Sequence, residues 1–317
     1  MSLYALIDAL LAALAWATSW LPVPLAEAFD YGFMQRALLA ALVVGSVCGV
    51  LSCFVILKRW ALLGDAISHA VLPGVAIAYL LGWPFFIGAF VTGAVTSVGI
   101  GALERHTRLK PDAAMGLMFT AAFALGVVII SQIATSTHLM HVLFGNVLGV
   151  DRNALALILG AGVISVVALL LLYRELFVYT FDEVHAQALG LNTTALHYGL
   201  ILLLTLTIVA SLETVGIILV VAMLITPGAT AYLLTDRLPR MLPLAAGFGA
   251  LSTVTGLLLA YHYDVASGGA MVLVATAVFL AVFLVAPRHG LLGRWLRRRP
   301  AARADAEGTS NARSNHR

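Results

Sequence analysis

The chain has 317 residues, of which 62% are hydrophobic and only 10% are charged, and its mean hydropathy is +1.01. A soluble domain cannot bury so much apolar surface, so this composition excludes a soluble globular protein and indicates a membrane protein with many helical spans. The net charge is only +3, and the distribution of the basic residues is explained below by membrane topology. We therefore expect the chain to contact the lipid bilayer and not to bind nucleic acid.

Residues 1–30 form an apolar N-terminal segment. Its first part, residues 3–20, carries Asp8 and lacks the basic start of a signal peptide. We expect this segment to be retained, either as an additional span or as a helix that lies at the membrane interface.

Nine apolar runs follow, each close to the roughly 20 residues that a helix needs to cross a bilayer. Their ranges are 37–57, 62–82, 84–103, 113–133, 154–173, 196–212, 215–234, 241–261 and 269–286. They predict an all-α, polytopic transmembrane helical bundle of about 8–10 spans that forms one domain over residues 31–287.

The second run contains Asp65 and His69, two polar residues inside an otherwise apolar span. A spacing of four residues places both side chains on one helix face, and an ionisable residue within a span normally faces the bundle interior or a wet cavity. A carboxylate and a neutral imidazole together suit a divalent first-row metal. The alternative is a hydrogen bond between the two residues that only satisfies buried polar groups.

Pro73 and Gly74, shortly after this pair, favour the metal site. Proline has no N–H group to donate to the carbonyl of His69, four residues earlier, and Gly74 adds a second soft point. Interrupted helices of this kind line transport sites in membrane proteins. We therefore predict that a transported cation is bound by Asp65 and His69, and we predict no catalytic residues.

Two outward-facing regions hold weaker candidates. His138 and His141 lie three residues apart in the link 134–153, where they are either a relay that captures metal at the entrance or ordinary solvated histidines. Glu213, in the turn between two spans, would add negative potential to an outer vestibule.

The longest link between spans, residues 174–195, predicts a short amphipathic helix near 182–190. Asp182 and Glu183 suit a helix N-terminus, and Gly190 suits the C-cap. A short capped helix at the membrane surface suits docking into the groove of a partner, and a plain interfacial helix is the alternative. The chain has no G-x-x-x-x-G-K-[ST] motif, so any energy from ATP must come from another subunit.

Lys and Arg residues divide unevenly between the two membrane faces. When the spans alternate in direction, all but Arg36 and Arg152 of the 18 basic residues lie on one face. Cytoplasmic links carry an excess of Lys and Arg, so this face is predicted to be cytoplasmic. The Arg-rich tail, 288–317, lies on the same side, and its composition predicts a disordered cytoplasmic C-terminus.

Six blocks of sequence resemble, in the same order, the membrane permeases of bacterial ABC importers for manganese, zinc and iron. The blocks are WALLGDAISHAVLPGVA, RLKPDAAMGLMFTAAFALGVVIIS, HVLFGNVLGV, FDEVHAQALGLN, ETVGIILVVAMLITPGATAYLLT and YHYDVASGG. The resemblance covers about residues 30–290 and implies a permease of the type II ABC importer kind in the bacterial inner membrane. It also implies a second permease copy, two cytoplasmic ATPase subunits and an extracytoplasmic metal-binding protein.

The same resemblance implies roles for individual residues. Asp65 and His69 match the metal-coordinating pair of the family, and the segment around Glu183, Ala186 and Gly190 matches the coupling helix that is seated in the ATPase.

The form GDAISHAVLPG resembles the manganese and iron branch, whereas zinc-type members tend to read GDTLAHASLLG. We therefore expect Mn²⁺ first, Fe²⁺ second and Zn²⁺ third as the transported ion, with no permanently bound cofactor and ATP acting only through the partner subunit. The alternative is a proton-coupled secondary transporter for divalent metals. Such a transporter would need acidic relays on several spans, and only Asp65 is clearly intramembrane.

Overall fold

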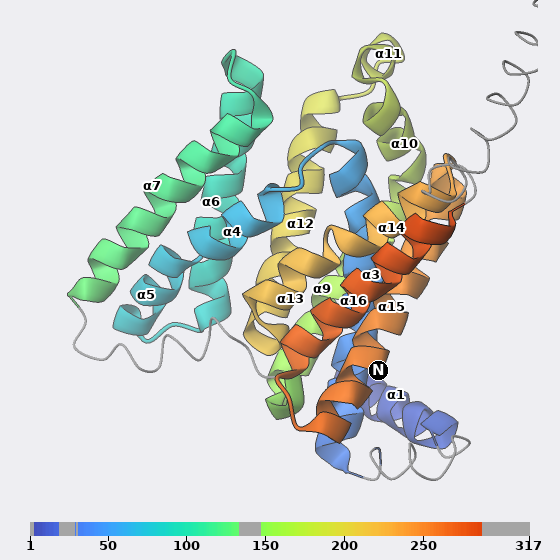
Figure 1. Cartoon of the computed structure of the whole chain (residues 1–317). Helices are drawn as coiled ribbons and strands as arrows, with labels where there is room; N and C mark the ends of the chain where they lie inside the picture. Colours follow the sequence, from blue (N-terminus) through green and yellow to red (C-terminus); the bar gives the residue numbers. More distant parts are fainter. Residues whose placement is uncertain (1–2, 19–28, 30, 133–146, 287–317) are drawn as a thin grey trace, which may run out of the picture.

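The computed structural model describes residues 3–18, 29, 31–132 and 147–286, and the helices named below lie within these ranges (Figure 1). Nine segments of the described chain are long and apolar enough to cross a membrane, which confirms the predicted all-α architecture. Seven of these segments are single helices: α3 (Gly32–Leu57), α6 (Phe85–His106), α7 (Pro111–Ser131), α9 (Arg152–Leu171), α12 (Thr193–Val215), α15 (Leu238–Tyr263) and α16 (Ser267–Val285).

The other two spans are each divided into two helices. The second span consists of α4 (Leu63–Ala70) and α5 (Leu72–Leu81), and the seventh consists of α13 (Ile217–Met223) and α14 (Thr226–Leu234). Three further helices are α1 (Leu3–Thr18), α10 (Tyr173–Phe181) and α11 (Glu183–Ala188), and a short 3-10 turn, η2, covers Val147–Gly149.

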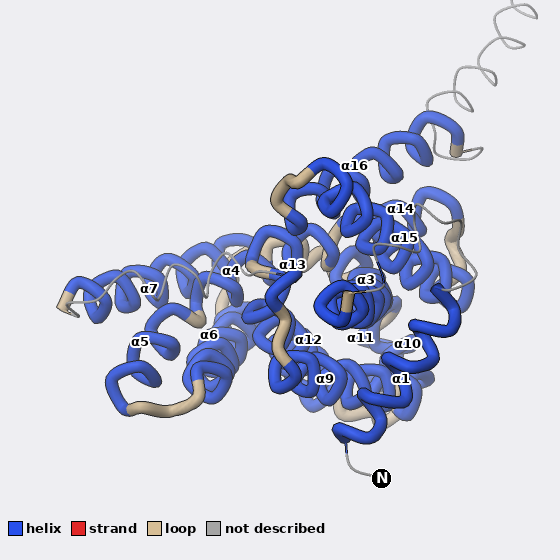
Figure 2. The backbone as a smooth tube through the Cα atoms, turned by 90° about the horizontal axis from the view of Figure 1, so that it is seen from below, coloured by secondary structure: helices blue, strands red, loops and turns tan. Residues whose placement is uncertain are grey.

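The spans form a main bundle with a smaller group of helices beside it. In Figure 1, α4, α5, α6 and α7 lie together on the left, and in Figure 2, α3 runs through the middle of the remaining helices. Helix α12 joins the two groups because it packs against α4 and α6 on one side and against α9 on the other. Helix α3 is accordingly one of the most buried spans, whereas α7 and α16 are mostly exposed along their lengths.

Small residues bring pairs of helices close together. A Cβ atom added to Gly45 on α3 would lie 2.6 Å from the carbonyl oxygen of Gly249 on α15. On α6, the Ser97 hydroxyl lies 2.7 Å from the Thr205 hydroxyl of α12. Small side chains at helix interfaces allow such approaches in membrane proteins.

The break in the second span lies at Val71, between α4 and α5, and Pro73 stands in the first turn of α5. The sequence suggested that Gly74 makes the span flexible, but the structure shows another role for this residue. A Cβ atom at Gly74 would overlap the carbonyl oxygen of Gly88, so the missing side chain allows α5 to pack tightly on α6. The position is thus set by close packing of two helices.

The division of the seventh span was missed by the sequence analysis. Thr226-Pro227-Gly228 opens α14 in the same way that Leu72-Pro73-Gly74 opens α5, and this repeated X-Pro-Gly pattern is the signal that could have revealed it. The two divided spans also meet, because the Leu224 side chain at the second break packs against Gly64 on α4.

The N-terminal helix α1 packs against the beginning of α9. Asp8 pairs with Arg152, and the Tyr4 hydroxyl donates a hydrogen bond to Asn153 over 3.2 Å. Arg152 is one of the two basic residues on the predicted outer face, and Figure 1 shows α1 lying across that end of the bundle. With 16 residues, α1 is shorter than the nine spans. These contacts join α1 to the start of α9, and both the interfacial helix and the tenth span stay predictions.

Candidate functional site

The predicted metal pair lies on the one face of α4 that is not covered. Six of the eight residues of α4 are buried, and the two that remain partly exposed are Asp65 and His69. Their side chains are 49% and 31% exposed, and His69 Nε2 lies 3.4 Å from Asp65 Oδ1. The pair therefore shares one helix face as predicted, and the described residues of this chain cover that face only in part. Helix α7 covers part of it, next to His69.

The imidazole of His69 is held by aromatic contacts from α7. Its ring centroid lies 5.4 Å from that of Phe119 and 5.7 Å from that of Phe123. The helix ends at Ala70, one residue after His69, and the Val71 N–H group bonds to the His69 carbonyl. His69 thus lies in the last turn of α4 beside the break, with its imidazole restricted in orientation, and Asp65 lies in the first turn.

Two residues are too few to enclose a divalent ion. Within the described part of the chain, no group of three or more His, Cys, Asp or Glu side chains is arranged to hold a metal. Glu213 is exposed in the last turn of α12 and does not join the pair in such a group. His138 and His141 lie outside the described residues, as does the tail 288–317.

The short helix predicted in the longest link is α11. The Asp182 carboxylate accepts a hydrogen bond of 2.9 Å from the His185 N–H group and so caps the N-terminus. At the other end, Gly190 has a φ of +79°, and the Leu191 N–H group bonds to the Ala186 carbonyl. These are the start and stop signals that the sequence contained.

The side chains at α11 divide into buried and exposed ones. Ala186 is fully buried. The large exposed apolar side chains are those of Val184, at 78%, and of Leu189, the C-cap residue, at 57%. Both were missed, although apolar residues in a surface link are themselves a signal of a docking surface.

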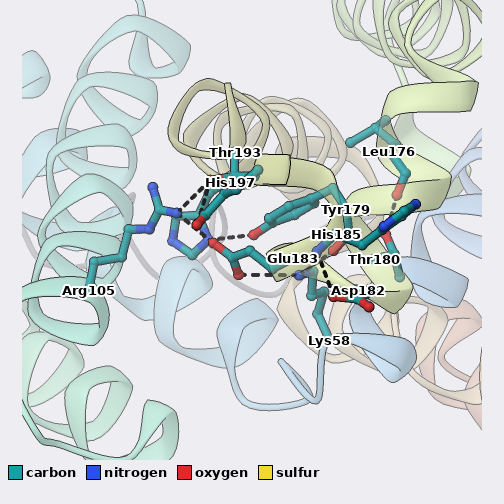
Figure 3. Close-up of polar contacts among 11 residues, drawn as sticks. Lys58, Arg105, Leu176, Tyr179, Thr180, Asp182, Glu183, His185, Thr193 and His197 are labelled. Carbon is teal, nitrogen blue, oxygen red and sulfur yellow. Dashed lines mark hydrogen bonds and ion pairs between the residues drawn. The ribbon is translucent and has the colours of Figure 1, made fainter. Parts of the chain in front are cut away.

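Glu183 also points toward the membrane domain (Figure 3). Its Oε1 atom accepts a hydrogen bond of 2.6 Å from Arg105 Nη2 at the end of α6, and its Oε2 atom lies 4.0 Å from Lys58 Nζ, just after α3. The expectation that the helix around Glu183 contacts the ATPase stays a prediction. The two cations, which lie far away in the sequence, attract the carboxylate inward.

A polar cavity of about 310 Å³ lies beneath α11. It is lined by Lys58, Trp60, Glu104, Arg105, Tyr179, Glu183 and His197. Lys58 Nζ donates to the Tyr179 carbonyl over 3.0 Å and lies 3.4 Å from the centre of the Tyr179 ring. The Tyr179 hydroxyl lies 2.8 Å from His197 Nδ1. Burial lowers the pKa of Lys58, while the nearby Glu183 carboxylate raises it.

The tertiary structure alone reveals this cavity. Burial also raises the pKa of the Tyr179 hydroxyl above its ordinary value. Tyr179 and His197 come from α10 and α12, and no motif in the sequence links them. Neither was a candidate from the sequence.

Comparison with known proteins gives a consistent assignment. Residues 30–286 match the ABC 3 transport family. The chain is 52% identical to the manganese transport system membrane protein MntC of Halalkalibacterium halodurans, over 88% of this chain and 96% of that protein. It is 46% identical to the chelated iron transport system membrane protein YfeD of Yersinia pestis, over 82% and 88% of the two chains.

A solved structure shares both sequence and fold with this chain. It is that of PsaBC from Streptococcus pneumoniae in complex with Fab, with a TM-score of 0.76 and 41% identity. The match covers 86% of this chain and 99% of that one. The chain therefore belongs to the ABC 3 transport family and is a membrane permease subunit of a bacterial manganese or iron ABC import system, in which a separate subunit is the ATPase.

Proposed function

We propose that this permease carries Mn²⁺ across the bacterial inner membrane into the cytoplasm, through a site that contains Asp65 and His69. The observation that carries the proposal is that these two ligands are the partly exposed residues of α4, directly before the break in the span. A carboxylate suits Mn²⁺, and the added imidazole keeps Fe²⁺ as the second choice and Zn²⁺ as the third. The naming of MntC for manganese transport supports the same order.

A second permease copy would complete the site. Two ligands from one chain leave most of the coordination sphere of Mn²⁺ unfilled, and the exposed fractions of Asp65 and His69 leave both accessible to another molecule. In a twofold-symmetric dimer, the same pair would come from each copy, because such an interface uses the same surface twice. Four protein ligands would then surround one ion.

The proposed direction of transport indicates which face of the permease each remaining subunit would contact. Two cytoplasmic ATPase subunits would each contact one α11 helix, through the exposed Val184 and Leu189 side chains. An extracytoplasmic metal-binding protein would deliver the ion to the opposite face, and the C-terminus would lie in the cytoplasm. A proton-coupled secondary transporter is no longer the alternative, because the chain belongs to an ABC transport family.

Metal uptake by cells that lack other importers tests the proposed site. Asp65→Asn keeps the size of the side chain but removes its negative charge, so Mn²⁺ uptake should fall to the background level while the complex still assembles. Asp112→Asn is the matched control, because Asp112 is an exposed acid at the start of α7 and should leave uptake unchanged. Uptake at the wild-type rate by a normally expressed Asp65→Asn variant would disprove the role of this carboxylate.

A further inference from the structure

Three charged residues from separate elements meet beneath α11. Glu183 lies on α11, Arg105 lies near the end of α6, and Lys58 follows α3 (Figure 3). Arg105 donates a charge-assisted hydrogen bond of 2.6 Å to Glu183, and Lys58 lies 4.0 Å from the other oxygen of the same carboxylate. We call these three residues the clasp.

Other hydrogen bonds hold the same side of α11 to the membrane domain. Arg105 lies 3.4 Å from the Thr193 hydroxyl at the start of α12, and Gln187 of α11 donates to that hydroxyl over 3.3 Å. Lys58 is bonded in addition to the carbonyl of Tyr179 on α10. The inner face of α11 therefore contacts residues at the ends of α3, α6 and α12, and Lys58 connects these contacts to α10.

Lys58 is also connected to the metal-bearing helix by a tightly folded corner. Arg59 has a φ of +60°, and the Trp60 N–H group bonds back to the Val55 carbonyl over 2.8 Å. Trp60 is 1% exposed, and its carbonyl accepts a hydrogen bond from Leu63, the first residue of α4. Only four residues, held by these contacts, therefore separate Lys58 from α4, whose first turn contains Asp65.

We infer that the clasp transmits movements of α11 to α4 and α6, which makes Glu183, Arg105 and Lys58 positioning residues for transport. In this arrangement, the outer face of α11 contacts the ATPase, and the inner face transmits the movement of α11 to α4 and α6. The inference rests on the proposed role of α11 as the ATPase-contacting helix. It assigns Glu183 to the internal linkage and not to the docking surface.

Removal of the Glu183 charge leaves another acid close to the two cations. Glu104 lines the same cavity, and its buried Oε2 atom accepts no hydrogen bond from the residues that the structure describes. Lys58 and Arg105 thus retain a nearby carboxylate in a Glu183→Gln variant, so the fold is expected to persist. Glu183→Gln can therefore test the connection of α11 to α4 and α6 without removing every negative charge from the cavity.

The experiment uses the permease purified together with its ATPase subunit and reconstituted into lipid vesicles. Retention of the ATPase, the rate of ATP hydrolysis and the Mn²⁺ transported per ATP are measured separately. Glu183→Gln and Arg105→Gln should each retain the ATPase and hydrolyse ATP, but transport about tenfold less Mn²⁺ per ATP, because a charge-assisted hydrogen bond is lost. The double variant should lose less transport per ATP than the two single losses combined, since both variants remove the bond between Glu183 and Arg105.

Two comparison variants make the result specific. Arg105→Lys preserves the positive charge and should keep most of the transport per ATP, and Asp112→Asn removes an exposed acid at the same end of the protein and should have no effect. Wild-type transport per ATP in both Glu183→Gln and Arg105→Gln would overturn the inference. So would release of the ATPase by Glu183→Gln, which would show a direct contact with Glu183 and leave the docking role of α11 intact. If Val184→Asp and Leu189→Asp leave the complex whole, the docking role itself fails and the inference fails with it.

Discussion

At the scale of single residues, α4 shows how a short sequence separates packing from ligand binding. Its small and apolar side chains are all buried, including Ala66, Ile67 and Ser68, while Asp65 and His69 emerge together on the remaining face. The aromatic rings of α7 restrict the imidazole without donating or accepting a strong hydrogen bond. These contacts leave the ring nitrogen Nε2 beside Asp65 Oδ1, at 3.4 Å.

His69 gives a prediction about metal preference. In His69→Cys, a soft thiolate replaces the imidazole, and thiolates favour Zn²⁺ over Mn²⁺. We expect Mn²⁺ uptake to fall and Zn²⁺ to become the stronger competitor in uptake assays with both ions. His69→Ala serves as the comparison, because it should lower Mn²⁺ uptake without increasing the competition by Zn²⁺. An unchanged order of competition in His69→Cys would argue against His69 as a ligand.

At the scale of elements, α11 has two distinct faces. Ala186 and Glu183 connect it to the membrane domain, and Val184 and Leu189 form an apolar outer surface. The helix is only six residues long, so its caps are essential for holding this shape. The left-handed conformation at Gly190 is readily adopted by glycine and disfavoured for other residues.

The outer face of α11 predicts a docking defect. Val184→Asp or Leu189→Asp would place a charge on the apolar surface that we expect to be buried by the ATPase, and such an unpaired charge is costly. The ATPase should then no longer co-purify with the permease, while the permease remains in the membrane at its normal level. Val184→Ile is the control, because it keeps the surface apolar. Normal co-purification of both aspartate variants would refute this surface as the docking site.

The divided spans are the second feature at this scale. Both α5 and α14 begin with an X-Pro-Gly sequence, and their partner half-helices α4 and α13 touch one another. Proline is well tolerated in the first turn of a helix because its missing N–H group would have no partner there. The first break follows His69 by two residues, and Leu224 at the second break packs against Gly64, the residue before Asp65.

At the scale of the whole molecule, a site shared between two copies has a distinctive consequence. If four ligands from two chains bind one ion, a dimer with one wild-type copy and one Asp65→Asn copy should have a single defective site. We expect such a heterodimer, isolated with two different affinity tags, to transport Mn²⁺ at far less than half the wild-type rate. A rate of one half would instead indicate that each copy transports ions independently.

Much of this architecture could be predicted from the sequence because its causes are local. The length and hydropathy of each apolar run determined the nine spans, and the distribution of Lys and Arg indicated their orientation. The end signals at Asp182 and Gly190 located α11 closely, since caps act within a few residues of the chain. The spacing of Asp65 and His69 likewise established that they share a helix face.

Only the tertiary structure decided which surfaces these elements cover and which they leave free. The inward direction of Glu183 depends on Arg105 and Lys58, which approach from two other helices. The pairing of Tyr179 with His197, the tight contact at Gly74 and the partial exposure of Asp65 similarly depend on how whole helices pack. Helical periodicity specifies which residues share a face, but it carries no information on which neighbour that face meets. That choice is made by the summed packing of side chains that are distant in sequence.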